Sequence, residues 1–392
     1  RKFNMMRLAK PLPLILLLIW ATTTSAAPRI IPKAPSVAAK AYILMDADSG
    51  HIITEGNSHE RLAPASLTKI MTSYAIFSEL RQGNITLEDE VTISEKAWRT
   101  GGSKMFIEVG KKIQVKDLMN GMIISSGNDA SVALAEHIGG AEETFAQLMN
   151  QYAEILGMKN SHFENATGMP ADNHYTSATD MAILSQALIR DFPEYYPIYA
   201  EKEFIYGKEL KSGKPIKQKN RNKLLWRDES VDGLKTGYTK AAGYCLVSSA
   251  KREEMRLISA VLGTKSTEAR AQETQKLLNF GFRFYETQTL ATPEQPLENS
   301  PIWKGAQEQI KLGVAEPLTV TLGRNQFKEL QSTIALDNPT LEAPIQQGTA
   351  LGSITYTVNG EPLVQAPLVA LESVEEGSLW NNLKDSVMMY FN

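Results

Sequence analysis

Two groups of strand-like segments, far apart in the chain, constrain the fold of this sequence more than any other feature. Residues 41–45 and 51–54 are apolar runs joined by the turn-forming stretch Asp46-Ala47-Asp48-Ser49-Gly50, and they predict a β-hairpin. Three further apolar or β-branched runs come much later, at residues 231–239, 244–250 and 255–262. Between the groups, helical patterns occupy residues 66–77, 113–155 and 178–189. We therefore predict an α+β domain in which both ends of the segment build one antiparallel sheet and helices cluster between them.

The chain beyond residue 288 has a different character. A helical pattern at 267–278 comes before it, and Pro293, Pro296 and Pro301 then stand among polar residues, so that residues 289–300 predict a linker. Short strand-like runs follow at residues 318–322, 333–336, 353–358 and 362–371. The last two are joined by the tight-turn pair Asn359-Gly360. These runs predict a small all-β domain.

The last fourteen residues, 379–392, form an amphipathic segment. Apolar residues recur at near-helical spacing, at Leu379, Leu383, Val387 and Tyr390, with Trp380, Met388 and Phe391 beside them. Such a helix can lie in a membrane interface. Lys384 and Asp385 cancel, however, so there is no electrostatic attraction to anionic lipid. A helix packed on its own domain is the other interpretation, and the pattern alone does not choose between the two.

The first 27 residues have the order of a secretory signal. Basic residues precede the apolar stretch 12–21, and small residues follow at 22–27. The apolar stretch is short for a membrane span, which disfavours the alternative of an uncleaved anchor. We expect the mature chain to be exported.

Composition argues against several classes of function. The net charge of −3 gives no reason to expect a nucleic-acid partner, and the five histidines show no metal-binding spacing. No metal and no organic cofactor is predicted. Cys245 is the only cysteine, so an internal disulfide is excluded, and its apolar surroundings predict a buried structural thiol.

The first chemically suggestive motif is Ser66-Leu67-Thr68-Lys69, at the start of a predicted helix. Residues three apart share a helix face, so the serine oxygen and the lysine nitrogen can meet. Lysine can deprotonate a serine only if burial or nearby positive charge lowers its pKa. A second copy, Ser248 to Lys251, ends a strand, where residues three apart point to opposite faces. We discard that copy.

Two further motifs follow. Ser126-Gly127-Asn128 offers a hydroxyl and an amide on a loop between helical segments, although Asn128 or Asp129 could simply cap the next helix. Lys235-Thr236-Gly237 ends a predicted strand. There the lysine would attract a carboxylate, and the glycine would let a substrate backbone lie against the strand edge.

Each motif is short enough to arise by chance, but all three occur in this order and in the settings that their chemistry needs. Class A β-lactamases and penicillin-binding proteins share this combination. The sequence resembles the low-molecular-mass penicillin-binding proteins that are D-alanyl-D-alanine carboxypeptidases, over nearly the whole mature chain. The likeness rests on residues 65–72, 125–130, 231–237 and 281–284.

The resemblance implies a β-lactamase/transpeptidase-like catalytic domain followed by a small β domain and an amphipathic membrane-anchor helix. The expected divisions are a signal peptide at 1–27, a catalytic domain at 28–288, a β domain at 289–375 and the anchor at 376–392. It therefore favours the membrane interpretation of the last segment. The expected location is the periplasmic face of the bacterial inner membrane.

By the same resemblance, Ser66 is the acylated nucleophile, Lys69 its general base and Ser126 part of the proton relay. The expected substrate-binding residues are Asn128, Lys235, Thr236, Gly237 and Arg270. Arg270 would bind the terminal carboxylate, although a surface arginine on the helix from residue 267 is the plainer interpretation. Tyr238 departs from the histidine expected in close relatives, which leaves fine specificity and pH dependence open.

The activity that the resemblance implies is removal of the terminal D-alanine from peptidoglycan pentapeptide stems through an acyl-enzyme, with covalent inhibition by β-lactam antibiotics. One alternative is a serine β-lactamase, for which Glu164 is a candidate base toward the deacylating water. The other alternative is a non-catalytic scaffold at the cell wall.

Overall fold

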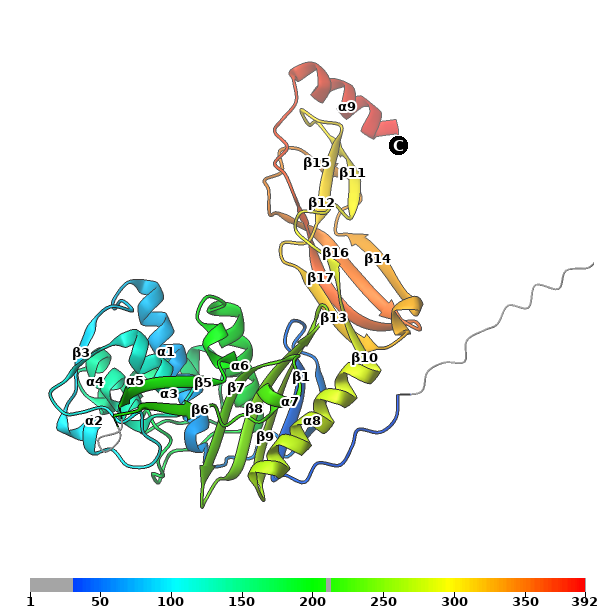
Figure 1. The fold of residues 1–392 in the computed structure, drawn as a ribbon. Helices are drawn as coiled ribbons and strands as arrows, with labels where there is room; N and C mark the ends of the chain where they lie inside the picture. Colours follow the sequence, from blue (N-terminus) through cyan, green and yellow to red (C-terminus); the bar gives the residue numbers. More distant parts are fainter. Residues whose placement is uncertain (1–30, 209–212, 392) are drawn as a thin grey trace, which may run out of the picture. The chain divides into compact units, whose positions relative to one another are not determined.

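The computed structural model describes residues 31–208 and 213–391, and the predicted export signal at 1–27 lies outside the described residues. Its main sheet has five antiparallel strands in the order β2-β1-β9-β8-β7. These strands are β1 (Ala41–Asp46), β2 (Ile52–Gly56), β7 (Val231–Thr239), β8 (Gly243–Arg252) and β9 (Met255–Thr264). Ala41 of the first strand pairs with Leu262 of the last. The predicted assembly of one sheet from two distant segments is therefore confirmed (Figure 1).

The two faces of this sheet are both covered, which explains why β8 and β9 are continuous apolar runs rather than alternating ones. On one face, α8 (Thr267–Phe284) packs with Leu277 and Leu278 near Leu257. On the other face, α6 (Ala178–Asp191) packs on β1 and β9. Cys245, on β8, is fully buried, in agreement with a structural thiol.

The helical cluster lies between the two strand groups in the sequence. Its longer helices are α1 (Thr68–Gln82), α3 (Val115–Ile123), α4 (Asn128–Gly139), α5 (Glu142–Ile155) and α6. The short helices among them are the 3₁₀ helices η1 (Ala65–Leu67) and η2 (Tyr196–Ala200) and the α-helices α2 (Glu95–Arg99) and α7 (Leu224–Arg227). Two short strand pairs also occur here. Strand β3 (Glu90–Thr92) pairs with β4 (Lys112–Gln114), and β5 (Glu203–Lys208) pairs with β6 (Pro215–Lys219). The predicted helical stretch 113–155 is thus three helices, and the break between α3 and α4 carries the second motif.

The remainder of the chain is mostly β-structure, as predicted. Six strands form a sheet in the order β14-β16-β17-β12-β11-β15, and β10 pairs with β13. The strands are β10 (Tyr285–Ala291), β11 (Glu298–Trp303), β12 (Gln309–Gly313), β13 (Leu318–Gly323), β14 (Leu330–Leu336), β15 (Leu341–Glu342), β16 (Ala350–Val358) and β17 (Glu361–Ala370), with the 3₁₀ helix η3 (Gln326–Glu329).

The segment 289–300, interpreted from its prolines as a linker, contains the end of β10 and the start of β11. Pro293 and Pro296 lie in the turn between these strands, while Pro301 lies within β11. Proline here therefore marks a turn and a strand position, not a stretch without regular structure.

A final helix, α9, spans Leu379–Phe391. Its Asp385 carboxylate accepts a hydrogen bond of 2.7 Å from the backbone amide of Lys304 in the neighbouring β-structure. In the two described ranges, no helix combines the length and the apolar character that crossing a membrane requires.

Candidate active site

Ser66 and Lys69 meet as the first motif predicts. Ser66 lies in η1, which leads directly into α1, and Lys69 lies in the first turn of that helix. The Lys69 Nζ is 3.1 Å from the Ser66 Oγ. The discarded copy behaves differently, because Ser248 is fully buried and its hydroxyl donates to the Gly233 carbonyl while Lys251 is exposed.

The surroundings of Lys69 favour an uncharged amine. The side chain is fully buried, and Nζ donates to Asn128 Oδ1 at 2.6 Å and to the Thr167 carbonyl at 2.7 Å. Burial first, and the positive charge of Arg221 second, lower the pKa of Lys69 to about 7, although Asp129 opposes them. A neutral amine has two N–H bonds for these two acceptors. Its lone pair is then left for the Ser66 hydroxyl.

The second motif lies on the short loop before α4. Ser126 has a left-handed backbone conformation, with φ of +62°, which is costly for a residue other than glycine. Asn128 does not cap the helix as one interpretation had it, because Gly127 is the N-cap and no side chain caps it. The Asn128 amide instead joins Lys69 to the Gly101 carbonyl, to which Nδ2 donates at 2.8 Å.

Asp129, the other candidate cap, holds a neighbouring loop. Its carboxylate accepts hydrogen bonds from the backbone amides of Met105, at 2.8 Å, and Phe106, at 2.9 Å. Because Gly101 lies at the start of the same loop, Asn128 and Asp129 fix it at two points. Both residues therefore shape the rim beside Ser126.

The third motif lies on β7, one of the two edge strands of the main sheet. Thr236 lines the same cleft as Ser66, whereas Lys235 is buried behind it. Gly237 has a structural role in addition to the predicted one. A Cβ at this position would lie 3.1 Å from both the Ala65 Cβ and the Pro64 carbonyl oxygen. The missing side chain therefore lets β7 pack closely against η1, which carries Ser66.

A cleft of about 450 Å³ brings these residues together. Its lining includes Ser66, Ser126, Asn128, Thr167, Arg221, Thr236, Gly237, Tyr238, Tyr244 and Arg270. Among the residues that the structure describes, no aspartate or glutamate lines this cleft. The cleft is accordingly a cationic site without a counter-ion of its own.

Buried positive charge is concentrated around the cleft. Burial first, and then the charges of Lys69, Arg221 and Arg270, hold the pKa of Lys235 well below its usual range. Charges that destabilise one another in this way are relieved when an anion enters. The cleft is therefore suited to a substrate that carries a carboxylate.

Arg221 is a cleft residue that the sequence did not reveal. Its guanidinium donates to Ser103 Oγ at 2.7 Å, and its side chain lines the cleft. It lies in the stretch Lys217 to Lys223, which holds four basic residues in seven, so no pattern in the sequence distinguishes it from its neighbours.

Arg270 is not a surface arginine, so the plainer interpretation of it is wrong. It follows the helix cap Ser266 by one turn, is only 5% exposed, and donates to the Gly237 carbonyl at 3.2 Å. Burial lowers the pKa of Arg270 to about 10, so it remains a cation at neutral pH. It lies where a carboxylate in the cleft could be bound.

Two comparisons with known proteins agree with this geometry. The D-alanyl-D-alanine carboxypeptidase family model, Peptidase S11, matches residues 28–266, and the model of the C-terminal domain of penicillin-binding protein 5 matches residues 285–376. The chain is 45% identical to the D-alanyl-D-alanine carboxypeptidase DacC of Escherichia coli, over 96% of this chain and 94% of that protein. The chain belongs to the D-alanyl-D-alanine carboxypeptidase family.

Solved structures support the same assignment. Penicillin-binding protein 5 from Haemophilus influenzae matches with a TM-score of 0.81 at 40% identity, over 88% of this chain and all of that one. Penicillin-binding protein D2 from Listeria monocytogenes, in its ampicillin-bound form, matches with a TM-score of 0.57 at 29% identity, over 63% of this chain and all of that one. The predicted fold class, family and enzyme class are therefore confirmed.

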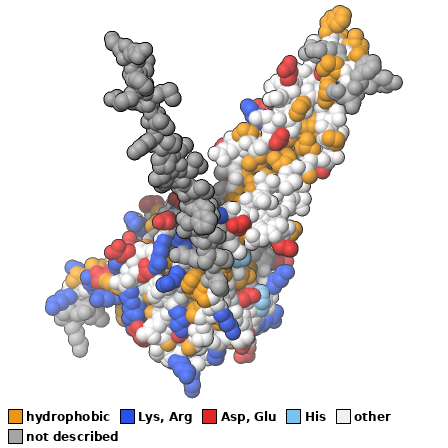
Figure 2. Space-filling view, turned by 90° about the vertical axis from the view of Figure 1, so that its right-hand side faces the viewer, with side chains coloured by type: hydrophobic (Ala, Val, Ile, Leu, Met, Phe, Trp, Pro, Cys, Tyr) orange, Lys and Arg blue, Asp and Glu red, His pale blue; other side chains and the backbone are white. Residues whose placement is uncertain are grey.

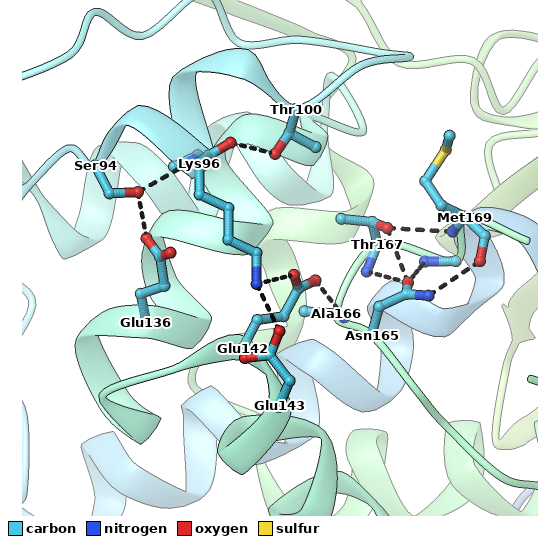
Figure 3. A network of polar contacts seen from close by, with 12 residues as sticks. Ser94, Lys96, Thr100, Glu136, Glu142, Glu143, Asn165, Ala166, Thr167 and Met169 are labelled. Atoms are coloured by element: carbon cyan, nitrogen blue, oxygen red, sulfur yellow. Dashed lines mark hydrogen bonds and ion pairs between the residues drawn. The ribbon is translucent and has the colours of Figure 1, made fainter. Parts of the chain in front are cut away.

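In this carboxypeptidase the loop of residues 163–169 lines the cleft with Thr167, Gly168 and Met169. Figure 3 shows the polar contacts that hold this loop. Asn165 Oδ1 accepts hydrogen bonds from the Thr167 amide and hydroxyl and from the Gly168 amide. The Glu142 carboxylate, itself 3.1 Å from the Lys96 amine, accepts a hydrogen bond from the Ala166 amide. These contacts fix the backbone that presents the Thr167 carbonyl to Lys69.

Glu164, the candidate base of the β-lactamase alternative, lies on this loop but does not face the cleft. Its side chain is exposed and does not line the cleft that holds Ser66. A base that activates the deacylating water must reach the acyl-serine directly or through one water. The position of Glu164 does not provide this.

Proposed function

We propose that this carboxypeptidase removes the terminal D-alanine of peptidoglycan pentapeptide stems, with Ser66 as the nucleophile. The observation that carries the proposal is the 3.1 Å approach of a buried lysine amine, whose pKa is lowered to about 7, to a serine hydroxyl that faces the cleft. A serine hydroxyl needs such a base to become a nucleophile at neutral pH.

In the first step, Ser66 Oγ attacks the carbonyl carbon of the penultimate D-alanine while Lys69 takes the hydroxyl proton. The C–N bond then breaks, and the proton passes through Ser126 to the amine of the departing D-alanine. The Ser66 backbone amide is a candidate oxyanion donor, and one such donor contributes about 3 kcal/mol. Water then hydrolyses the ester, and Ser66 recovers its proton.

The substrate carboxylate would enter the cationic part of the cleft. Lys235, Thr236 and Arg270 are the proposed ligands from the sequence, and Arg221 is added because it lines the same cleft. Asn128 would hold the substrate amide. The outer edge of β7, at Gly237, would accept the peptide as an added strand.

A β-lactam would acylate Ser66 and remain attached. The ampicillin-bound relative supports this, since a protein of similar fold was solved with that drug bound. The cleft lining contains no carboxylate among the described residues, which disfavours rapid deacylation of the kind that a class A β-lactamase performs.

We also propose that the mature chain is exported and held at the periplasmic face of the inner membrane by α9. What supports the anchor is the exposure of five apolar side chains on that helix, Leu379, Trp380, Leu383, Val387 and Met388. Figure 2 shows hydrophobic side chains gathered where the chain ends in α9. The division into residues 28–288, 289–375 and 376–392 stays a prediction.

The test is D-alanine release from a pentapeptide that ends in D-Ala-D-Ala, using the purified mature protein. We expect release by the native protein and a loss of at least about 10³-fold in Ser66→Ala, because the covalent route is removed. Ser248→Ala, in the discarded copy of the motif, is the control with near-native release. Equal activity of the two variants would refute Ser66 as the nucleophile, and no release by the native protein would favour the scaffold alternative.

A fluorescent penicillin distinguishes the carboxypeptidase from a β-lactamase. We expect a covalent adduct that persists through denaturing electrophoresis in the native protein and is missing in Ser66→Ala. Rapid turnover of the drug without a lasting adduct would favour the β-lactamase alternative.

A further inference from the structure

His174 is a buried titratable side chain that the proposed mechanism does not use. It is 5% exposed, and its ring packs edge-on against Phe163 at 5.8 Å between centroids. It comes from the segment between the 163–169 loop and α6, yet it reaches the catalytic helix, because Nε2 lies 2.8 Å from Thr68 Oγ1. Thr68 stands between Ser66 and Lys69 in the first motif.

The hydrogen bonds of His174 determine its tautomer. The Glu164 backbone amide donates to Nδ1 at 3.1 Å, so Nδ1 carries no hydrogen. The ring hydrogen is then on Nε2, which donates to the Thr68 hydroxyl. One ring therefore connects the beginning of the loop to the beginning of α1, with one donor and one acceptor.

The contacts around Thr68 show why this connection bears on Lys69. A Cβ built on Gly168 would lie 2.9 Å from Thr68 Oγ1 and 1.7 Å from the Ala65 carbonyl oxygen. The loop backbone thus presses directly on the first turn of the catalytic helix. At the same place, the Thr167 carbonyl accepts the hydrogen bond from Lys69 and excludes water from its amine.

We propose that His174 is a positioning residue that holds the 163–169 loop against Thr68. It thereby keeps water away from the Lys69 amine and keeps that amine within hydrogen-bond distance of Ser66 Oγ. The proposal rests on the role of Lys69 as the general base. Burial is the first cause that lowers the pKa of Lys69, so loosening the loop and admitting water should raise that pKa. The other charged groups that act on Lys69 and its surroundings are Arg221, Asp129 and Lys235. The hydrogen bonds of His174 go to Thr68 and to the Glu164 backbone instead.

The ring must be uncharged to make both bonds, since a protonated ring would present a second donor to the Glu164 amide. Burial first, and His162 second, lower the pKa of His174 to about 4, which keeps the ring neutral across the range in which Lys69 titrates. His174 itself therefore does not add a titration near pH 7.

The experiment measures the rate of Ser66 acylation by a fluorescent penicillin between about pH 5 and 9, which brackets the expected Lys69 titration. His174→Leu keeps the bulk and removes both hydrogen bonds, whereas the amide of His174→Gln supplies a donor and an acceptor. We expect the acid limb of the leucine variant to move to higher pH by at least about half a unit, which makes the rate at pH 7 at least roughly twofold slower. The glutamine variant should keep the native limb.

A matched control is His162→Gln, because His162 directly precedes the loop and its ring bonds to the Asn173 carbonyl rather than to Thr68. It should leave the pH profile unchanged. If His174→Leu does not fold, Thr68→Val removes the other end of the same bond and should show the same shift. An acid limb unchanged in the folded leucine and valine variants would overturn the inference, as would a glutamine variant that behaves like leucine. Failure of the native protein to be acylated would instead overturn the proposed function.

Discussion

At the scale of single residues, the chemistry depends on one amine that has been removed from water. A lysine with the ordinary pKa of about 10.4 is almost entirely protonated at pH 7 and cannot accept the serine proton. Here burial and Arg221 bring the pKa of Lys69 to about 7, so that a large fraction is neutral at that pH. Its two acceptor partners, Asn128 and Thr167, direct the remaining lone pair toward Ser66.

Arg221 provides a test of this electrostatic account. The guanidinium lowers the pKa of Lys69, so Arg221→Gln should raise it and move the acid limb of penicillin acylation to higher pH. Acylation needs neutral Lys69, so the rate should rise as pH increases through the pKa, in the native protein near pH 7. The measurement is the acylation rate at a saturating concentration of the penicillin, so that a shift of the acid limb is not confused with weaker binding of the drug.

Arg227→Gln is the matched control for that measurement. Arg227 lies on α7 near Arg221 but is paired with Glu268 and does not line the cleft. It should keep the native limb. A limb that stays in place in Arg221→Gln, or that moves equally in both variants, would contradict the electrostatic role of Arg221.

At the scale of elements, the serine is held by two close backbone approaches. The loop reaches η1 at Gly168, and β7 reaches it at Gly237. Between them, Ala65 has a φ of +48°, a left-handed conformation that an alanine adopts at a cost of about 1–3 kcal/mol. The residue that precedes the nucleophile is thus strained, and the elements on both sides leave it no room to relax.

Gly168→Ala should therefore be severely destabilising. A Cβ would lie 1.7 Å from the Ala65 carbonyl oxygen, so backbone must move, and penicillin acylation should fall by at least about tenfold. Gly83→Ala is the matched control, because Gly83 also has a positive φ, +74° against +85°, but open space around it. Urea denaturation should show a loss of about 1 kcal/mol for Gly83→Ala and clearly more for Gly168→Ala. Equal losses would mean that conformation alone, and not the contact, sets the cost.

The elements also show what the sequence could and could not predict. The main sheet was predictable because β8 and β9 are buried on both faces, which leaves continuous apolar runs. Strand β10 was missed because its residues are largely polar and give no apolar pattern. The hydroxyl groups of Thr287 and Thr289 form hydrogen bonds with threonines of β13. The three motifs were predictable because they use side chains.

The parts of the site that the sequence did not reveal are those without a side-chain signature. The acceptor that Thr167 offers to Lys69 is a backbone carbonyl, which any residue carries. The value of Gly237 lies in a contact with Ala65 that only the folded chain creates. The burial of Arg270 follows from the packing of α8 on β8 and could not be told from one helical turn of sequence.

At the scale of the whole molecule, the site exists only when distant parts of the chain have closed on one another. Ala41 pairs with Leu262, and Ser66, Ser126, Thr236 and Arg270 share one cleft. The net charge of −3 is opposite in sign to the charge of the cleft, so the positive charge is confined to the cleft. This distribution suits a small anionic substrate rather than a large polyanion such as a nucleic acid.

The proposed anchor gives the last prediction at this scale. Lys384 and Asp385 are the only charged residues of α9 and cancel, so binding to lipid should come from apolar burial alone. Each of the exposed apolar side chains can contribute about 1.5–3 kcal/mol when buried. The mature protein should therefore float with vesicles of phosphatidylcholine alone, and added phosphatidylglycerol or salt should change binding by less than about threefold. The double variant Leu383→Glu, Val387→Glu should lose flotation, and Ser386→Glu on the same helix should keep it.

Both variants should release D-alanine from a soluble pentapeptide at the native rate, since none of these residues lines the cleft. Binding that requires phosphatidylglycerol, or that survives in the double variant, would show that α9 is not an apolar anchor.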